Sequence, residues 1–155
     1  MRIFVDMDGV IADFQHAVEE YKKDNNIPAC KKLHRPELKI DFTKIPVMPG
    51  AIEALHKLRT DGHDIFIATT PSWDRPETWG HKRDWIVEHF PWLKRKMFLT
   101  HRKDLLDGDI LIDDTRFRGQ PNFKGTWIWF GVGNGCKDWK EVLEFINEKF
   151  DNEEI

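Results

Sequence analysis

Short apolar runs recur along this chain and are separated by stretches of mixed polarity. The first run, Arg2-Ile3-Phe4-Val5, is rich in residues that favour β structure, as expected of a buried strand in a parallel sheet. Runs of the same kind predict further strands over residues 64–68, 97–99, 109–112 and 126–130. The pattern therefore predicts five short strands.

Stretches with helical periodicity lie between these strands. The spacing of Ala51, Leu55 and Leu58 predicts a helix that stops before Gly62. A second helix is predicted around residues 77–90. A closing helix has its apolar residues on one stripe, namely Trp139, Val142, Leu143, Ile146 and Phe150. Because strands alternate with helices, we predict an α/β protein, a Rossmann-like three-layer sandwich with a central parallel sheet.

Residues 15–45 interrupt this alternation. The segment is polar and basic, begins with a helical pattern and then becomes irregular around Pro28 and Pro36. We interpret it as a small, partly helical cap inserted after the first strand. The whole chain, residues 1–155, is then a single domain that carries one insertion.

Composition narrows the class of protein. A hydrophobic fraction of 40% with 33% charged residues is typical of a soluble globular chain. The net charge of −3 counts against a surface that mainly holds nucleic acid. No apolar run approaches the ~20 residues of a membrane span, and the chain enters its first strand without a signal-like segment, so we expect a cytoplasmic location. Two cysteines, Cys30 and Cys136, are too few for a disulfide framework.

Polar side chains follow four of the predicted strands. They are Asp6 and Asp8, Thr69 and Thr70, Lys103, and Asp113 and Asp114. Each cluster taken alone could be an ordinary turn, a helix cap or a solvated lysine. In a parallel sheet, however, the carboxyl ends of the strands share one edge, so these clusters should meet there. Acids, hydroxyls and a cation together suit a divalent metal and a phosphate.

The order of these motifs resembles the haloacid dehalogenase superfamily of aspartate-nucleophile phosphatases. The flanking residues are similar to the motifs of its 5'(3')-deoxyribonucleotidase family, at residues 6–14, 46–51, 67–71, 100–103, 108–114 and 118–120. Thr70 stands where that family usually has Ser, a change that keeps the hydroxyl. The likeness covers most of the chain outside the cap and the last helix.

This resemblance implies a mechanism. Asp6 would attack phosphorus and form an aspartyl-phosphate, while Asp8 would act as general acid and base. It also implies a Mg²⁺ ion, held by Asp6, the backbone carbonyl of Asp8, and Asp114. Asp113 would bind the metal through a water molecule, or it would contact the residues that bind the metal. The sequence leaves open which acid of the Asp113–Asp114 pair touches the metal.

The resemblance also implies substrate contacts. Thr69, Thr70 and Lys103 would hold the phosphoryl group. Phe14 would pack near the nucleobase, with the alternative that it is a core aromatic anchoring the cap.

Some residues near these motifs remain open. Lys82 either reaches the phosphate or is a solvated lysine, and Arg116 or Arg118 could face the substrate. Trp73 and Trp79 could line the mouth of the site or lie apart from it.

We therefore predict a Mg-dependent phosphatase that hydrolyses (deoxy)nucleoside monophosphates. The alternative is a related phosphatase for a sugar phosphate or a polynucleotide 3'-phosphate, because a short cap can leave the site open. A non-catalytic domain on the same scaffold is disfavoured because Asp6, Asp8 and Lys103 are all present. We expect a small-molecule nucleotide as the partner, with no membrane and no nucleic acid, and a homodimer is left open.

Overall fold

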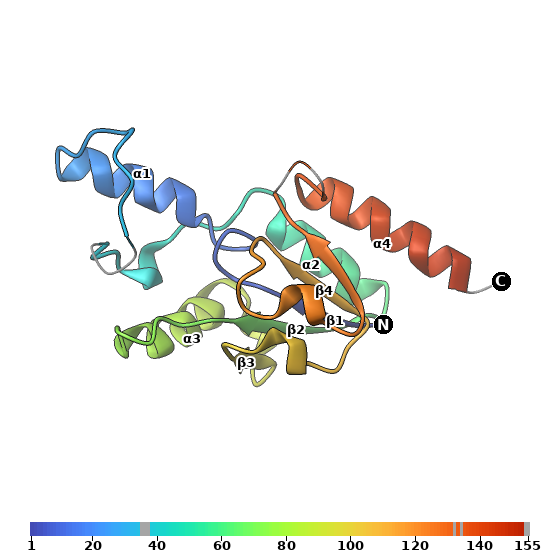
Figure 1. Cartoon of the computed structure of the whole chain (residues 1–155). Coiled ribbons are helices and arrows are strands. Elements are labelled where there is room, and N and C mark those ends of the chain that lie inside the picture. The colour runs from blue at the N-terminus through green and yellow to red at the C-terminus, as the bar shows by residue number, and fades with distance from the viewer. Residues whose placement is uncertain (35–37, 132, 134, 154–155) are drawn as a thin grey trace.

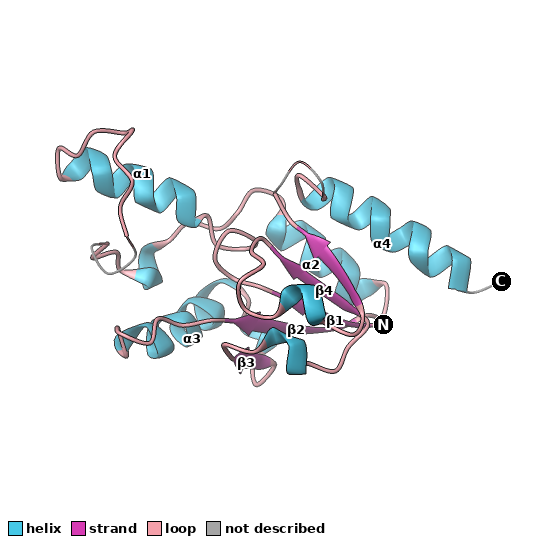
Figure 2. Ribbon diagram, viewed as in Figure 1, coloured by secondary structure: helices cyan, strands magenta, loops and turns pink. Residues whose placement is uncertain are grey.

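Five parallel strands form one central sheet (Figure 2). They are β1 (Arg2–Val5), β2 (Asp64–Thr69), β3 (Met97–Leu99), β4 (Ile110–Asp113) and β5 (Thr126–Trp129), in the spatial order β3-β2-β1-β4-β5. In the central strand β1, Ile3 pairs with Ile65 of β2 and with Ile110 of β4. The strand order reverses between β1 and β4. Open α/β sheets bind ligands at such a switch point, beside the carboxyl ends of the strands.

Helices cover one face of this sheet. They are α2 (Ala51–Thr60), α3 (Glu77–His89) and α4 (Trp139–Glu153). Ile3 and Val5 of β1 point to this face and join side chains of all three helices in one buried cluster. Helix α4 runs beside α2 (Figure 1). The computed structural model describes residues 1–34, 38–131, 133 and 135–153, and the side chains of these up to residue 150.

The opposite face carries a smaller cluster around Phe4, Ala68 and Leu111. It is covered by the β3–β4 and β4–β5 crossovers, which each contain one short 3-10 helix, at Lys103–Leu105 and Gln120–Asn122. This is the predicted Rossmann-like α/β fold with a thin layer on its second side. Since both crossovers are short, their first residues stay close to the carboxyl edge of the sheet.

The chain between β1 and α2, which we call the insertion, leaves the sheet and returns to it. Helix α1 (Phe14–Asp24) begins after Asp13, whose carboxylate accepts a bond from the backbone N–H of His16, and it projects away from the sheet (Figure 1). The returning chain contains the 3-10 helix Phe42–Lys44, and its next residue, Ile45, accepts a 2.7 Å bond from the indole N–H of Trp85. The irregular stretch predicted around Pro36 lies outside the described residues.

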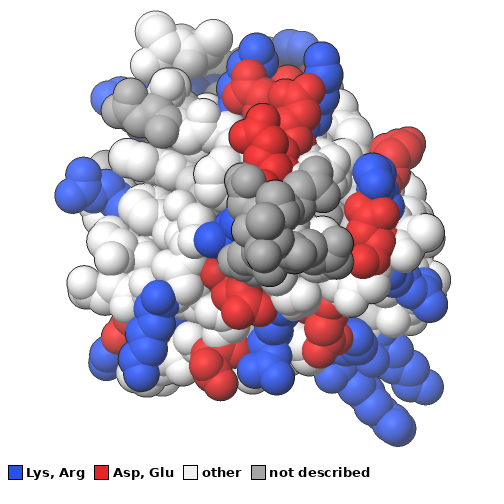
Figure 3. All heavy atoms as spheres, turned by 90° about the vertical axis from the view of Figure 1, so that its right-hand side faces the viewer, with Lys and Arg blue, Asp and Glu red and all other residues white. Residues whose placement is uncertain are grey.

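The observed boundaries lie close to the predicted ones. Strand β2 continues to Thr69, and β4 runs from Ile110 to Asp113, so these two polar residues belong to the strands that they were predicted to follow. No described helix is long and apolar enough to cross a membrane. Acidic and basic side chains are mixed on the face shown in Figure 3, which therefore does not present a uniformly basic surface.

Candidate active site

A tight turn at the end of β1 places two acids beside β4. The backbone N–H of Asp6 donates to the carbonyl of Ile112 over 2.9 Å, which extends the β1–β4 pairing by one residue. Gly9 then adopts φ +79°, a conformation that favours glycine, and a side chain there would collide with the Asp114 carboxylate. The turn therefore requires glycine so that Asp6 and Asp8 can approach Asp114.

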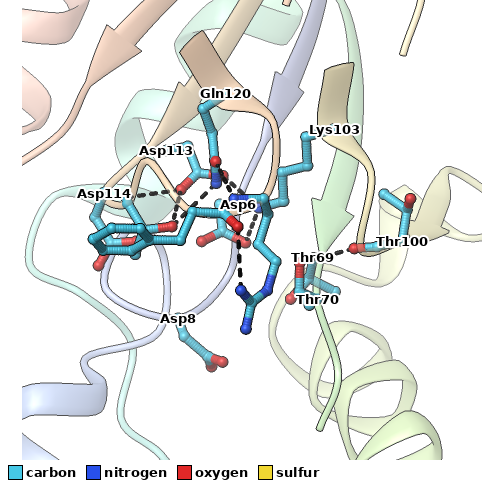
Figure 4. Close-up of polar contacts among 12 residues, drawn as sticks. Asp6, Asp8, Thr69, Thr70, Thr100, Lys103, Asp113, Asp114 and Gln120 are labelled. Carbon is cyan, nitrogen blue, oxygen red and sulfur yellow. Dashed lines mark hydrogen bonds and ion pairs between the residues drawn. The ribbon is translucent and has the colours of Figure 1, made fainter. Parts of the chain in front are cut away.

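A cleft opens at this edge of the sheet, and we call it the acidic cleft. It is lined by Asp6, Asp8, Thr70, Lys103, Asp114, Thr115, Phe117 and Arg118. Figure 4 shows Asp6, Asp113 and Asp114 close together beside Lys103, with Asp8 farther away. Five of the seven predicted strand-end residues thus line one cleft. Asp113 and Thr69 lie behind its surface, almost fully buried.

Lys103 links the acids of the two strands. Its ammonium lies 2.8 Å from Asp6 Oδ1 and also contacts Asp113 Oδ2, and its side chain is 2% exposed. Burial alone would lower the pKa of Lys103, but the charges of Asp6 and Asp113 outweigh it and raise that pKa. Lys103 is therefore a firmly charged cation. Burial also raises the pKa of Asp6, and the charge of Lys103 opposes that effect.

Asp113 orients this lysine. Its Oδ2 also accepts a 3.0 Å bond from the amide of Gln120, and its Oδ1 accepts a 2.9 Å bond from the backbone N–H of Thr115. Both oxygens thus have protein partners, and the side chain is fully buried. Gln120 is fully buried as well. Such a network holds Lys103 in one orientation against Asp6.

The acids fit a divalent cation. Asp6, Asp113 and Asp114 each offer a carboxylate oxygen, and these oxygens lie within 4.8 Å of one another. Asp114 Oδ1 is buried and has no hydrogen-bond partner among the described residues. Burial and the charges of Asp6 and Asp113 raise the pKa of Asp114 to about 8. Clustered carboxylates with an unsatisfied oxygen are the hard oxygen ligands that Mg²⁺ prefers.

A second buried ion pair lies beside the cleft. Lys82 of α3 is fully buried, and its ammonium lies 2.7 Å from Asp8 Oδ2 and 3.0 Å from Thr69 Oγ1. Lys82 is therefore not a solvated lysine. The Thr69 hydroxyl faces Lys82, whereas Thr70 donates a 2.8 Å bond to the carbonyl of Thr100 and lines the cleft.

A second, smaller pocket of mixed polarity adjoins the acidic cleft, and we call it the aromatic pocket. It is lined by Asp8, Phe14, Leu38, Ile40, Phe42, Thr70, Ser72, Arg75 and Lys82. The rings of Phe14 and Phe42 stack with centroids 5.8 Å apart. Asp8 and Thr70 line both hollows, so the two meet at these residues. Phe14 thus packs within the cap and also faces the pocket.

Sequence reasoning missed part of this arrangement. Arg75 donates to the carbonyls of Leu38 and Ile40 and ties the returning chain of the insertion to the loop after β2. The sequence carried a signal for the burial of Lys82, because the large apolar residues Trp85 and Ile86 follow it at helical spacing. Trp73 and Trp79 contact His101 and line neither hollow, and Trp73 is 78% exposed.

Two solved structures share this fold. The HAD-hydrolase YfnB from Bacillus subtilis, solved bound to magnesium, matches with a TM-score of 0.61 at 14% sequence identity, over 94% of this chain and 98% of that chain. A hydrolase from Pseudomonas syringae matches with a TM-score of 0.58 at 17% identity, over 95% and 98%. At these identities the likeness shows that the fold is shared.

The sequence comparisons are more specific. The profile of the family "5' nucleotidase, deoxy (Pyrimidine), cytosolic type C protein" matches residues 25–146. A protein of Vibrio phage KVP40, named as a 5'(3')-deoxyribonucleotidase, is 29% identical over 95% of this chain and 85% of its own length. A protein of the same name from Staphylococcus epidermidis (strain ATCC 35984) is 32% identical over 94% and 96%. The chain belongs to this nucleotidase family and is a phosphoric monoester hydrolase.

Proposed function

We propose that this enzyme hydrolyses (deoxy)nucleoside monophosphates to nucleoside and inorganic phosphate. The observation that carries the proposal is the meeting of two different hollows at Asp8. The acidic cleft suits a metal and a phosphate, and the aromatic pocket beside it presents aromatic side chains on which a nucleobase can pack. A nucleotide carries a phosphate and a base on one sugar, and the ester oxygen between phosphate and sugar must be protonated when it leaves.

In the first step, a carboxylate oxygen of Asp6 attacks phosphorus, and the bond from phosphorus to the nucleoside oxygen breaks. Asp8, in its protonated form, gives a proton to that oxygen and becomes the carboxylate that pairs with Lys82. The position of Asp8 between the two hollows supports this role, because the leaving oxygen lies between phosphate and nucleoside. Lys103 offsets the charge of the transferring phosphoryl group.

In the second step, water attacks the phosphorus of the aspartyl-phosphate. Asp8 takes a proton from that water, and the bond from phosphorus to Asp6 breaks, which releases phosphate and restores the Asp6 carboxylate. The ion pair with Lys82 holds the Asp8 carboxylate near Asp6 between the two steps.

Asp6, Asp114 and the backbone carbonyl of Asp8 would hold Mg²⁺. When bound, the ion reduces the repulsion between these carboxylates and the phosphate dianion. The unsatisfied oxygen of Asp114 supports direct contact with the metal. Asp113 accepts hydrogen bonds from Lys103, Gln120 and Thr115. These bonds support a role for Asp113 in orienting Lys103 rather than in binding the metal directly.

Phe14 and Phe42 would hold the nucleobase, with residues 15–45 acting as the cap. Thr70 would contact the phosphoryl group directly. Thr69 would act on the phosphoryl group indirectly, because its hydroxyl accepts a hydrogen bond from Lys82.

Phosphate release in the presence of Mg²⁺ tests the proposal. The panel contains deoxy- and ribonucleoside 5'- and 3'-monophosphates, sugar phosphates and a 3'-phosphorylated oligonucleotide. We expect mononucleotides to be preferred and activity to be lost in EDTA and in Asp6→Asn. Asp8→Asn should lower kcat by about 10²–10⁴. Asp107→Asn is the matched control, because that fully exposed acid pairs with Arg2 at the other end of β1.

The other outcomes are distinct. Turnover of sugar phosphates or of the oligonucleotide alone would keep the chemistry and replace the substrate. An Asp6→Asn variant that retains full activity would contradict the nucleophile.

A further inference from the structure

Arg118 is held by its backbone at the mouth of the acidic cleft. Its carbonyl accepts a 2.8 Å bond from the backbone N–H of Lys103, and its own N–H donates to Gln120 Oε1 over 2.7 Å. Gly119, which follows, takes φ +91°, and a side chain there would collide with the carboxylate of Asp104. Both polar backbone atoms of Arg118 are therefore fixed to the network that orients Lys103.

The side chain of Arg118 is available for a ligand. The residue is exposed and lines the cleft together with Asp6, Asp8 and Lys103. Its guanidinium makes one 3.2 Å bond, to the carbonyl of its neighbour Phe117, and forms no ion pair with any residue in the described part of the chain. A rigid backbone that presents an unpaired, forked cation to a cleft is suited to bind an anion.

The charges of the cleft explain why such a cation is needed. Lys103 is already paired with Asp6 and Asp113, and Lys82 is paired with Asp8. Neither lysine therefore has its full charge available for a phosphate. Asp114 adds a further acid without a cationic partner among the described residues. The acids of the cleft outnumber these two lysines, so a phosphate dianion that enters before a divalent ion is bound meets net negative charge from them.

We propose that Arg118 is a substrate-binding residue that grips the phosphate oxygens from the open side of the cleft. The identity of the physiological ligand, a nucleoside monophosphate, rests on the proposed function. Arg118 binds the phosphate group, whatever the base, while Phe14 and Phe42 contact the nucleoside. The guanidinium can donate two parallel bonds to two phosphate oxygens.

Arg116 provides an internal comparison. It carries the same charge, lies two residues earlier in the same loop and is exposed, but it does not line the cleft. General attraction between the loop and an anion would involve both arginines. Direct binding would involve Arg118 alone.

The experiment is a calorimetric titration of the whole protein, with Mg²⁺ present, using inorganic phosphate as the probe. We expect Arg118→Ala to weaken phosphate binding by about ten- to a hundredfold, the usual effect of removing a hydrogen bond to a charged group. Arg118→Lys should recover part of the affinity, because it restores the charge without the fork. Arg116→Ala should bind phosphate as the wild type does. Thermal unfolding of each variant checks that the fold is kept.

Steady-state kinetics with a deoxynucleoside monophosphate completes the test. KM should rise in Arg118→Ala by a factor similar to the loss of phosphate affinity. Equal phosphate affinity in Arg118→Ala and Arg116→Ala would overturn the role of Arg118, and so would a wild type that binds no phosphate. The titration measures phosphate binding and does not require turnover. It therefore still tests the role of Arg118 if the enzyme does not hydrolyse nucleotides.

Discussion

Individual side chains in this site are held by buried ion pairs rather than by the shape of the cleft. Lys103 and Lys82 come from different crossovers, yet each is almost fully buried against one acid of the turn after β1. Taking such charges out of water is costly unless each has a partner. The pairs therefore fix Asp6 and Asp8 more firmly than exposed carboxylates could be fixed.

The Asp8–Lys82 pair makes a quantitative prediction about stability. Lys82→Met leaves the Asp8 carboxylate buried without its cation and should lower the free energy of unfolding by about 3–5 kcal/mol. Adding Asp8→Asn should restore part of that loss, because both charges are then gone. Urea unfolding of the two single variants and the double variant measures the coupling.

Lys57→Met is the control for this cycle. Lys57 pairs with Asp61 over 2.8 Å on the surface, where such a pair contributes about 1 kcal/mol or less. Strictly additive effects of Lys82→Met and Asp8→Asn would show that the buried pair does not act as a unit.

At the scale of elements, the insertion packs apolar residues such as Phe42 and Ile45 into the main core, and hydrogen bonds add further points of attachment. One is the Trp85 indole, which donates to the carbonyl of Ile45. Another is Arg75, whose guanidinium donates to the carbonyls of Leu38 and Ile40 over 2.9 and 3.3 Å. These bonds hold one wall of the aromatic pocket, so the geometry of that pocket depends on an arginine outside the insertion.

Removing Arg75 should loosen this wall without unfolding the sheet. In Arg75→Ala, we expect amide hydrogen exchange in residues 38–46 to become about tenfold faster or more, because bonds from a charged group are lost. The sheet strands should exchange at their former rate. Arg83→Ala, which removes an exposed arginine from α3, is the matched control. Unchanged exchange in Arg75→Ala would mean that other contacts hold the wall.

At the scale of the whole molecule, the metal-free enzyme concentrates negative charge at one edge of the sheet. Asp6, Asp113 and Asp114 approach one another there, and burial with these charges raises the pKa of Asp114 to about 8. An unfolded Asp has a pKa of about 3.9. Between these values the folded protein binds a proton that the unfolded chain has lost, so stability falls as the pH rises through this interval.

Mg²⁺ should reverse this loss. We expect added Mg²⁺ to raise the midpoint of thermal unfolding, and to raise it more near pH 8 than in mild acid, because the ion binds the ionised carboxylates. Both the Mg²⁺ effect and the pH slope should shrink in Asp114→Asn and persist in Asp107→Asn. A midpoint that does not respond to Mg²⁺ at either pH would contradict a metal at this cluster.

The sequence by itself determined the fold class, the approximate limits of the strands and the gathering of the strand-end residues at one edge. The reason is that alternating apolar runs dictate a parallel sheet, and a parallel sheet places all carboxyl ends together. Only the tertiary structure decided what each side chain does there. A lysine on a helix can be solvated or buried, and the packing of α3 made Lys82 the partner of Asp8. Two adjacent acids look alike in the sequence, but the bonds from Lys103 and Gln120 distinguish Asp113 from Asp114. Such differences depend on contacts between segments far apart in the chain, which no local pattern records.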